Sequence, residues 1–311
     1  MLKTNSLIGP IDPAPETGYQ NPPPRKGFFT DTSVCIGCKA CEVACKEWND
    51  VPDDGFAFTG MSYDNTASLN ANTWRHVAFI EQPQRAAPVD LGMPTLGSAT
   101  QETGTEGTAA TDLGTQPDFR WLMSSDVCKH CTHAACLDVC PTGALFRTEF
   151  GTVVVQADVC NGCGYCVPAC PYGVIERRDE PDGAKNVGVA QKCTLCYDRL
   201  KVGETPACAK ACPTESIQFG DVEELRQRAS RRVQDLHDRG VMDARLYGND
   251  PNDGVGGTGA FFLLLDEPEV YGLPPDPVVT TRDLPQMFNR ATTAAGMMLL
   301  GVVAAYVGSR R

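Results

Sequence analysis

The sequence predicts an α+β protein that is built around a repeated cysteine-rich unit and ends in one apolar helix. Three observations support this fold class. All sixteen cysteines gather in four short runs, patterns typical of short strands and of one amphipathic helix lie between and after the runs, and an uncharged segment follows Arg290. A chain of 311 residues has room for two domains of ordinary size.

The four cysteine runs are the strongest feature of the sequence. In chain order they are Cys35, Cys38, Cys41 and Cys45; Cys128, Cys131, Cys136 and Cys140; Cys160, Cys163, Cys166 and Cys170; and Cys193, Cys196, Cys208 and Cys212. Proline follows the last cysteine of three runs, at Pro141, Pro171 and Pro213, whereas Lys46 follows the first run. The recurrence of this phrase predicts a repeated structural unit.

The spacing of these cysteines is typical of iron–sulfur proteins. The pattern Cys-x2-Cys-x2-Cys curls a short loop so that three thiolates converge on one cluster, and a fourth cysteine ligates the neighbouring cluster. Residues 160–170 match this pattern in full, whereas the second run widens one gap and the fourth run separates its two pairs by eleven residues. We expect the fourth cysteine to begin a helix that points away from the loop. Four complete sets predict four [4Fe-4S] clusters.

Two other uses of cysteine fit the runs less well. Disulfide frameworks are typical of small secreted domains with scattered cysteines, and structural zinc is usually bound by separated Cys-x-x-Cys pairs. Three of the runs place four cysteines within 11 to 13 residues, which favours iron over a zinc-binding structural module, the remote alternative. His130 and His133 lie within the second run, but a histidine ligand would require a missing cysteine, and none is missing.

The composition excludes some functions. The formal net charge of −12 argues against nucleic-acid binding, which requires a basic surface. The sequence contains no arrangement typical of a catalytic site or a nucleotide loop, so it predicts electron transfer and no catalytic residues. Lys39, Lys129, Lys192 and Arg199 lie beside cysteines, where they either tune the clusters or are solvated surface charges.

Strand and helix signals occupy the segments outside the runs. Five segments have the apolar patterns of strands: 74–80, 119–123, 145–148, 152–155 and 260–265. The third and fourth of these flank a short turn and predict a hairpin. Asp221, with Glu224 three residues later, is a capping-box signal for an amphipathic helix that ends at Gly240.

The two ends of the chain and one long internal segment have distinct compositions. Residues 1–30 are proline-rich and predict an extended arm without a signal peptide, and residues 87–117 predict a long Gly/Thr-rich surface loop. Residues 291–309 carry no charge and would form a helix of about 28 Å, close to the ~30 Å hydrocarbon thickness of a membrane. They predict one membrane span; the alternative is an amphipathic helix docked on a soluble partner.

Several phrases resemble a known family. They are residues 29–49, Tyr63-Asp64-Asn65, residues 193–199, residues 203–208 and Tyr271-Gly272-Leu273-Pro274. With them the chain resembles the four-cluster ferredoxin-type subunits that serve molybdopterin oxidoreductases, and most closely the iron–sulfur (β) subunit of respiratory formate dehydrogenases. The resemblance extends over residues 28–275. Nitrate reductase β subunits are similar but carry tryptophan at the position of Cys163, which argues against them.

The resemblance implies a crossed arrangement of ligands, in which the first run pairs with the fourth and the second with the third. The four ligand sets are then Cys35, Cys38, Cys41 and Cys212; Cys45, Cys193, Cys196 and Cys208; Cys128, Cys131, Cys136 and Cys170; and Cys140, Cys160, Cys163 and Cys166. The fold that follows is two ferredoxin-like [4Fe-4S] modules, one inserted in the other, plus a C-terminal transmembrane helix.

This fold divides the chain into six parts. They are an extended arm at 1–30; a first module at 31–50 and 190–222; an insertion with strands and the long loop at 51–125; a second module at 126–189; a helix and extension at 223–285; and a membrane anchor at 286–311.

The resemblance also implies a function in anaerobic respiration. Electrons would pass from a large formate-oxidising molybdopterin subunit, with molybdenum or tungsten, through the four clusters to a membrane cytochrome b and the quinone pool. The alternative is the same role in another molybdopterin oxidoreductase or a hydrogenase complex. The cluster modules are expected on the outer side of the cytoplasmic membrane, exported with a twin-arginine-tagged partner.

Overall fold

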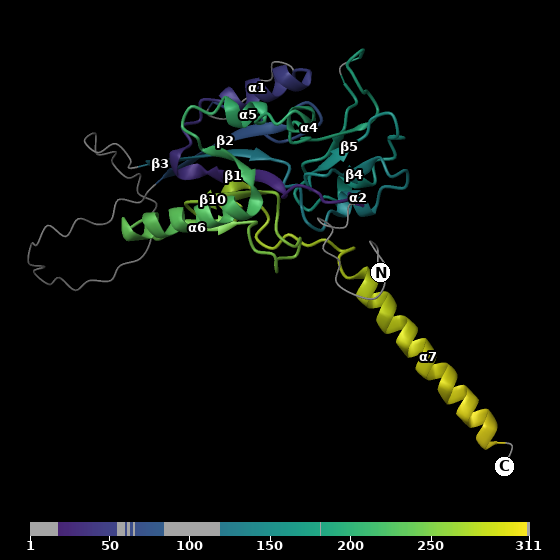
Figure 1. Ribbon diagram of the computed structural model, residues 1–311. Coiled ribbons are helices and arrows are strands. Elements are labelled where there is room, and N and C mark those ends of the chain that lie inside the picture. Colours follow the sequence, from purple (N-terminus) through teal and green to yellow (C-terminus); the bar gives the residue numbers. More distant parts are fainter. Residues whose placement is uncertain are drawn as a thin grey trace, which may run out of the picture.

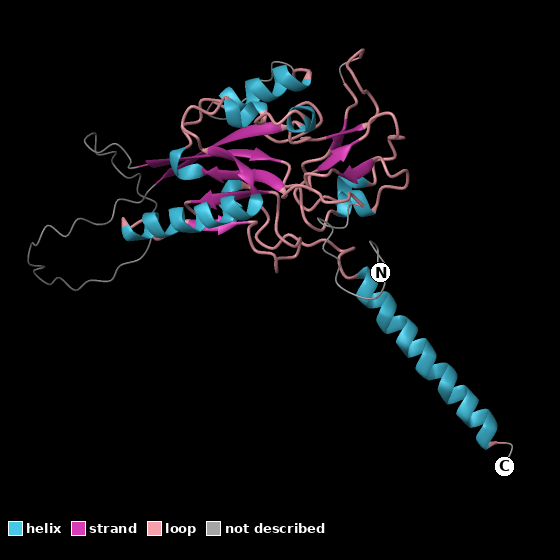
Figure 2. Ribbon diagram, viewed as in Figure 1, coloured by secondary structure: helices cyan, strands magenta, loops and turns pink. Residues whose placement is uncertain are grey.

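The computed structural model describes residues 18–54, 60, 63, 64, 66–83, 119–180 and 182–309. The first 17 residues of the expected arm, the expected loop at 87–117 and the last two arginines lie outside the described residues. The described chain forms a mixed body of short helices and strands, from which one long helix extends (Figures 1 and 2).

A four-stranded sheet in the order β8-β1-β10-β9 forms the centre of the body. Strand β1 (Lys26–Asp31) pairs antiparallel with β8 (Ile217–Asp221) and parallel with β10 (Ala260–Leu264), which in turn pairs antiparallel with β9 (Arg245–Tyr247). Every residue of β10 is buried, so the predicted buried strand is confirmed. The β1 and β10 strands thus anchor the first cysteine run, which begins four residues after the end of β1.

Helix α6 (Val222–Asp238) packs against this sheet through an apolar face that includes Leu225 and Ala229. The predicted helix is confirmed, and Gly240 lies beyond its end with a φ of +86°. The predicted capping box is wrong, because the Asp221 side chain makes no hydrogen bond to the helix backbone. Its carboxylate forms an ion pair with the ammonium group of Lys26 instead.

Strands β2 (Arg75–Pro83) and β3 (Phe119–Val127) form a separate antiparallel pair. Both predicted strands in this part of the sequence are confirmed, and each extends four or fewer residues further than expected. The short helix η1 (Thr32–Val34) lies between β1 and the first cysteine, and it contacts β3 and β10. This contact brings the first run against the β2–β3 pair.

The helices of the first and fourth cysteine runs lie together. Helix α1 (Ala40–Asn49) packs against α5 (Ala207–Lys210), and α4 (Tyr197–Lys201) precedes α5 in the fourth run. Figure 1 shows these three helices on one side of the body, although more than 140 residues separate α1 from α4 in the sequence.

The second and third runs are also side by side. Helix α2 (Ala135–Asp138) packs against α3 (Cys166–Ala169). Two short antiparallel pairs accompany them: β4 (Leu145–Arg147) with β5 (Val153–Val155), and β6 (Glu176–Arg177) with β7 (Ala190–Gln191). The β4–β5 pair confirms the predicted hairpin, and Leu145 lies opposite Val155 as the alternating pattern requires.

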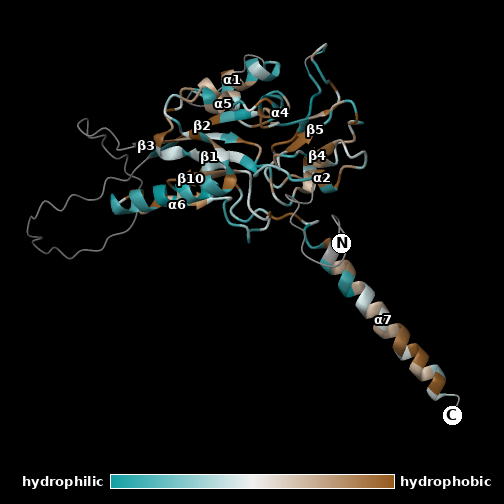
Figure 3. Cartoon of the chain, in the orientation of Figure 1, coloured by the Kyte–Doolittle hydropathy of each residue, from teal (hydrophilic) through white to brown (hydrophobic). Residues whose placement is uncertain are grey.

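The chain leaves the body through η2 (Pro268–Tyr271) and ends in α7 (Leu284–Gly308). Residues 286–308 of α7 are long and apolar enough to cross a membrane, and none of this segment is buried within the chain. Figure 3 shows that the helix becomes more hydrophobic toward its C-terminal half, where Leu299 and Leu300 are exposed. An apolar helix of this length that is not buried within the chain is consistent with anchoring in a membrane.

Candidate cluster-binding sites

The sixteen cysteines are all free thiols. Each run places its third cysteine in the first turn of a helix, as with Cys166 at the start of α3. The fourth cysteine follows one turn later, within α1 in the first run and just beyond the helix in the other three. The expectation that the fourth cysteine begins a helix is therefore wrong. The helix begins one cysteine earlier, and a single turn carries the chain from one group of thiols to the next.

One group of four thiols surrounds a cavity between α1, β3 and the end of α5. Cys35, Cys38, Cys41 and Cys212 line this cavity, which we call site 1. Gly37 in the loop has a φ of +64°, and a Cβ atom there would lie 2.6 Å from Met123 Sδ and from Phe79. Only glycine therefore lets the loop turn this tightly against β2 and β3.

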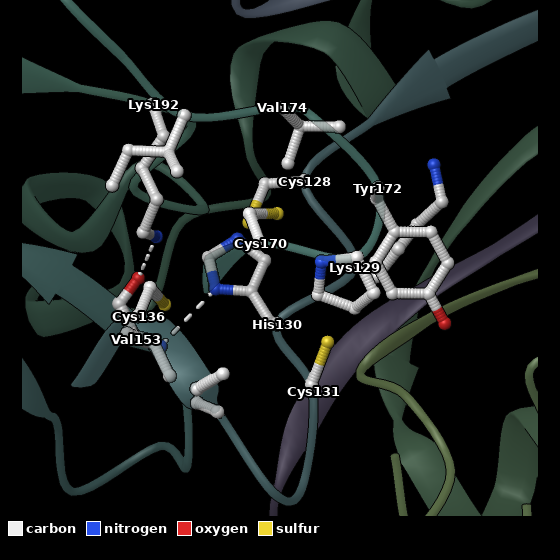
Figure 4. A pocket seen from close by; sticks show the side chains of 14 residues that line it. Cys128, Lys129, His130, Cys131, Cys136, Val153, Cys170, Tyr172, Val174 and Lys192 are labelled. Carbon is white, nitrogen blue, oxygen red and sulfur yellow. Dashed lines mark hydrogen bonds between the residues drawn. The ribbon is translucent and has the colours of Figure 1, made fainter. Parts of the chain in front are cut away.

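A second cavity lies between α2 and the segment that follows α3. Its lining includes Cys128, Cys131, Cys136 and Cys170, which we call site 3 (Figure 4). His130, Lys129 and Lys192 also line this cavity, and all three are almost completely buried. Site 3 therefore combines four thiols with an imidazole and two cations.

The eight other cysteines form two further groups. Cys45, Cys193, Cys196 and Cys208, which we call site 2, are all buried. The side-chain nitrogen of Asn49 lies 3.7 Å from Cys45 Sγ and 4.0 Å from Cys196 Sγ, so one amide joins cysteines of the first and fourth runs.

Site 4 comprises Cys140, Cys160, Cys163 and Cys166. Burial raises the pKa of the Cys166 thiol to about 11, and the nearby thiols of the other three cysteines add to the rise. Cys163 is exposed, as is Cys38 at site 1. The two sites with an exposed cysteine therefore differ from sites 2 and 3, where none is exposed.

The thiols have unusual proton affinities. Burial raises the pKa of Cys41, Cys136 and Cys193 to about 12. Burial also acts to raise the pKa of Cys140, but hydrogen bonds from Leu145, Thr142 and Ala144 together outweigh it, so this pKa is lowered. Mutual repulsion adds to the high values, so these groups of thiols become thiolates together only when iron supplies positive charge.

The arrangement fits iron–sulfur clusters. Four thiols surround each of two cavities, as the four irons of a cubane require. Over the residues that the structure describes, no three His, Cys, Asp or Glu side chains are placed to hold a single metal ion. A polynuclear cluster, whose ligands stand further apart than those of one zinc ion, agrees with this geometry.

The four basic residues beside the cysteine runs are buried or half-buried. Lys129, Lys192 and Arg199 are buried, and Lys39 is half-buried. Lys192 donates to the carbonyl oxygens of Val153 and Cys193, and Arg199 pairs with Glu204 at 2.9 Å. The interpretation of these groups as solvated surface charges is therefore wrong for the three buried residues.

Sequence reasoning missed Arg75, the first residue of β2. Arg75 is only 1% exposed, and the thiols of Cys208, Cys41, Cys193 and Cys45 surround it. The only signal in the sequence was a charged residue within a strand-like apolar pattern, which alone does not tell a buried arginine from a solvated one.

Comparison with known proteins decides the family. Residues 34–144 and residues 119–222 each match a family model described as a 4Fe-4S dicluster domain. The formate dehydrogenase iron–sulfur subunit of Haemophilus influenzae is 38% identical over 283 residues, which cover 90% of this chain and 77% of that protein. The chain belongs to the family of formate dehydrogenase iron–sulfur subunits. The resemblance seen in the cysteine phrases is thus confirmed.

Other members and relatives of the formate dehydrogenase iron–sulfur subunit family agree. The nitrate-inducible formate dehydrogenase iron–sulfur subunit of Escherichia coli is 37% identical over 285 residues, covering 89% of this chain and 83% of that protein. The B subunit of the anaerobic dimethyl sulfoxide reductase of E. coli is 33% identical over 202 residues, covering 65% of this chain and 76% of that protein. As a member of this family, the chain binds [4Fe-4S] clusters and transfers electrons within an oxidoreductase complex.

Proposed function

We propose that the chain holds four [4Fe-4S] clusters, one at each of sites 1 to 4, and conducts electrons through them. The observation that carries this proposal is that sixteen free thiols fall into four groups of four, with three members from one run and one from another. The crossed ligand sets and the inserted module of the sequence analysis are part of the proposal.

We propose the order 1, 2, 3, 4 for the clusters. In this order, a thiol of one site lies near enough to raise the pKa of a thiol of the site before it: Cys208 of site 2 acts on Cys41 of site 1, and Cys128 of site 3 acts on Cys193 of site 2. Cys166 of site 4 likewise acts on Cys136 of site 3. A series of neighbouring sites with an exposed cysteine at each end, Cys38 and Cys163, suits electron transfer between two partners.

A bound [4Fe-4S] cluster supplies one-electron redox chemistry. The chain's own residues provide the rest: the thiols fix each cluster, and burial of the four cysteines of site 2 excludes water there. Hydrogen bonds and charges around the thiols set the reduction potentials.

We propose that the electrons come from formate oxidation by a large molybdopterin subunit with molybdenum or tungsten. The relatives named as formate dehydrogenase subunits support this substrate, because they match about nine-tenths of the chain. The dimethyl sulfoxide reductase relative matches only 65% of it, which makes that system the second candidate. A membrane cytochrome b is the proposed acceptor.

We propose that α7 spans the membrane once and that electrons leave through site 4. The segment before α7 is attached between site 3 and site 4, because Thr281 Oγ1 donates to Asp138 Oδ2 at 2.5 Å, and Asp138 lies two residues from both Cys136 and Cys140. Site 4 is the end of the proposed order. Site 1, at the other end of the order, would receive electrons from the catalytic subunit. The location of the body outside the cytoplasm rests on the family resemblance alone.

Anaerobic analysis of iron and acid-labile sulfide tests the central proposal. Four cubanes require about sixteen irons and sixteen sulfides in each chain. A fully loaded protein that contains about twelve irons or fewer would contradict four [4Fe-4S] clusters. A colourless protein with zinc instead of iron would support the structural-module alternative.

A further inference from the structure

We propose that Arg75 is a hydrogen-bond donor and counter-charge shared by the clusters of sites 1 and 2, and that it raises the reduction potentials of both. This inference rests on the proposed occupancy of these sites. Arg75 begins β2, and its side chain lies inside the body between the first and fourth cysteine runs.

The guanidinium group of Arg75 is only partly satisfied by the protein. Its Nη1 atom donates to Ser125 Oγ at 3.0 Å and to the Ser125 carbonyl oxygen at 3.3 Å. Its Nε and Nη2 atoms are buried and have no hydrogen-bond partner within the described chain. Buried donors without acceptors are costly, and those of a charged group more so. Two buried donors therefore need acceptors that the protein itself does not supply.

The surroundings of Arg75 identify those acceptors. The groups that favour its charge are the thiols of Cys208, Cys41, Cys193 and Cys45, which belong to both sites. Ser125 links it to site 1 directly, because Ser125 Oγ also lies 3.2 Å from Cys41 Sγ. No carboxylate of the described residues forms an ion pair with Arg75. Cluster sulfides and thiolates are the anionic acceptors that this position can reach.

The expected effect follows from charge. Reduction adds one negative charge to a cluster, and a fixed cation in a buried environment stabilises that charge. Hydrogen bonds to the sulfur atoms act in the same direction. A structural role is the competing explanation, because the guanidinium carbon also lies 4.9 Å from the centre of the Phe28 ring.

The test uses Arg75→Met in the intact complex, with iron analysis and a potentiometric titration followed by electron paramagnetic resonance. We expect full iron content, and we expect the reduction potentials of two of the four clusters to fall. Each should fall by at least about 59 mV, which for one electron is a tenfold change in the ratio of oxidised to reduced cluster. Arg178→Met is the matched control. Arg178 is similarly buried, but its charged neighbour is Asp50 and it bonds to Asn72 and Ala71.

Four unchanged potentials in a fully loaded Arg75→Met complex would overturn the proposal, as would equal shifts in the Arg178→Met control. If Arg75→Met loses iron, Arg75→Lys decides. Lysine keeps the charge but lacks the branched guanidinium group that could donate to both sites, so the reduction potential of at least one of the two clusters should fall. Unchanged potentials or loss of iron in Arg75→Lys would indicate a structural role. Failure of the cluster proposal itself is separate, because it would appear as low iron in the wild-type complex.

A different observation carries a second inference at site 3. We propose that the Nε2–H group of His130 donates a hydrogen bond to the cluster or thiolates of that site. Figure 4 shows the His130 ring among the sulfur atoms of Cys128, Cys136 and Cys170. Its Nδ1 atom accepts a hydrogen bond from the backbone N–H of Val153 at 3.1 Å.

The tautomer of His130 follows from this bond. A neutral imidazole whose Nδ1 accepts must carry its proton on Nε2. The Nε2 atom is buried and has no partner in the described part of the chain. The donor therefore lies at a cavity that is lined by four cysteine thiols.

Three variants test this donor by the same titration. His130→Leu should lower the reduction potential of one cluster only, and His130→Gln should lower that potential by less. His133→Leu should change no potential, because His133 does not line the cavity. A fully loaded His130→Leu complex with four unchanged potentials would overturn the proposal. If His130→Leu loses iron and His130→Gln retains it, the donor role is supported; loss of iron in both would overturn it.

Discussion

Cys41 and Cys45 lie one helical turn apart on α1, yet their thiols belong to different groups of cysteines. Cys41 lines the cavity of site 1, whereas the thiols of Cys193, Cys208 and Cys196 surround Cys45. A separation of four residues places two side chains on the same face of a helix, about 5–6 Å apart. The α1 helix is therefore a short link between two sites, and each end of the turn can be tested separately.

Replacement of Cys45 should perturb site 2 and spare site 1. We expect Cys45→Ala to lose or convert one cluster while the signal of the cluster held by Cys35, Cys38 and Cys41 persists. The measurement is iron content together with electron paramagnetic resonance of the reduced complex. Cys212→Ala is the matched control and should perturb site 1 instead. A structure with all four cysteines of the first run on one cluster would refute the crossed arrangement.

Gly37→Ala should weaken site 1 through a steric clash. A Cβ atom there would lie 2.6 Å from Met123 Sδ and Phe79, in a backbone conformation with positive φ. Gly164, beside Cys163, also has a positive φ, of +76°, but open space around it. Both alanine variants carry the backbone strain, roughly 1–2 kcal/mol, and Gly37→Ala carries about 1–3 kcal/mol more from overpacking.

The denaturant concentration at which cluster absorbance is lost measures this difference. Gly37→Ala should lose its absorbance at a clearly lower concentration than Gly164→Ala. Equal midpoints for the two variants would show that the contact with Phe79 and Met123 has no energetic consequence.

Features that depend on a local pattern could be predicted from the sequence, whereas features that depend on contacts between distant segments could not. The hairpin of β4 and β5 and the buried strand β10 follow from alternation and from continuous apolar residues. The burial of Arg75 was not predictable, because it depends on thiols from runs that meet only in the fold. Likewise Asp221 is a residue type that is favoured at a helix cap, but its carboxylate forms an ion pair with Lys26 on the neighbouring strand.

Removal of the clusters should make the remaining fold sensitive to alkaline pH. Burial raises the pKa of Cys41, Cys136 and Cys193 to about 12 from the ordinary value of 9.0. In the folded chain without clusters these thiols stay protonated, whereas in the unfolded chain they ionise at the ordinary pKa. Their contribution to stability is therefore fully present below about pH 9 and is lost as pH rises toward about 12.

Urea unfolding of the chelator-treated chain at pH 8 and above checks this sign. The unfolding midpoint should fall steadily with rising pH, and Cys41→Ser should reduce the slope. A midpoint that is flat or rises with pH would contradict the burial of protonated thiols.

Formate should reduce the clusters only when the catalytic partner is present. We expect formate to bleach the brown absorbance of the intact complex and to leave the isolated chain unchanged, because the proposed site of formate oxidation is on the catalytic partner. Dithionite reduces both and is the control for competent clusters. If formate leaves the intact complex oxidised while another donor reduces it, the proposed substrate is wrong and the role in electron transfer still stands.

The last prediction concerns α7. Removal of residues 288–311 should release the complex from membranes without detergent, because this deletes most of the exposed apolar segment 286–308. Dye-linked formate oxidation should persist, since sites 1 to 4 lie outside the deleted segment, whereas reduction of quinone should be lost. Leu299→Lys with Leu300→Lys offers a finer test: both side chains are exposed, and each lysine at the centre of a bilayer costs roughly 2.5–3.5 kcal/mol. Arg290→Gln, near the start of the helix, is the control and should remain bound. A wild-type complex that washes off membranes in high salt would show that α7 docks on a partner instead of crossing the bilayer.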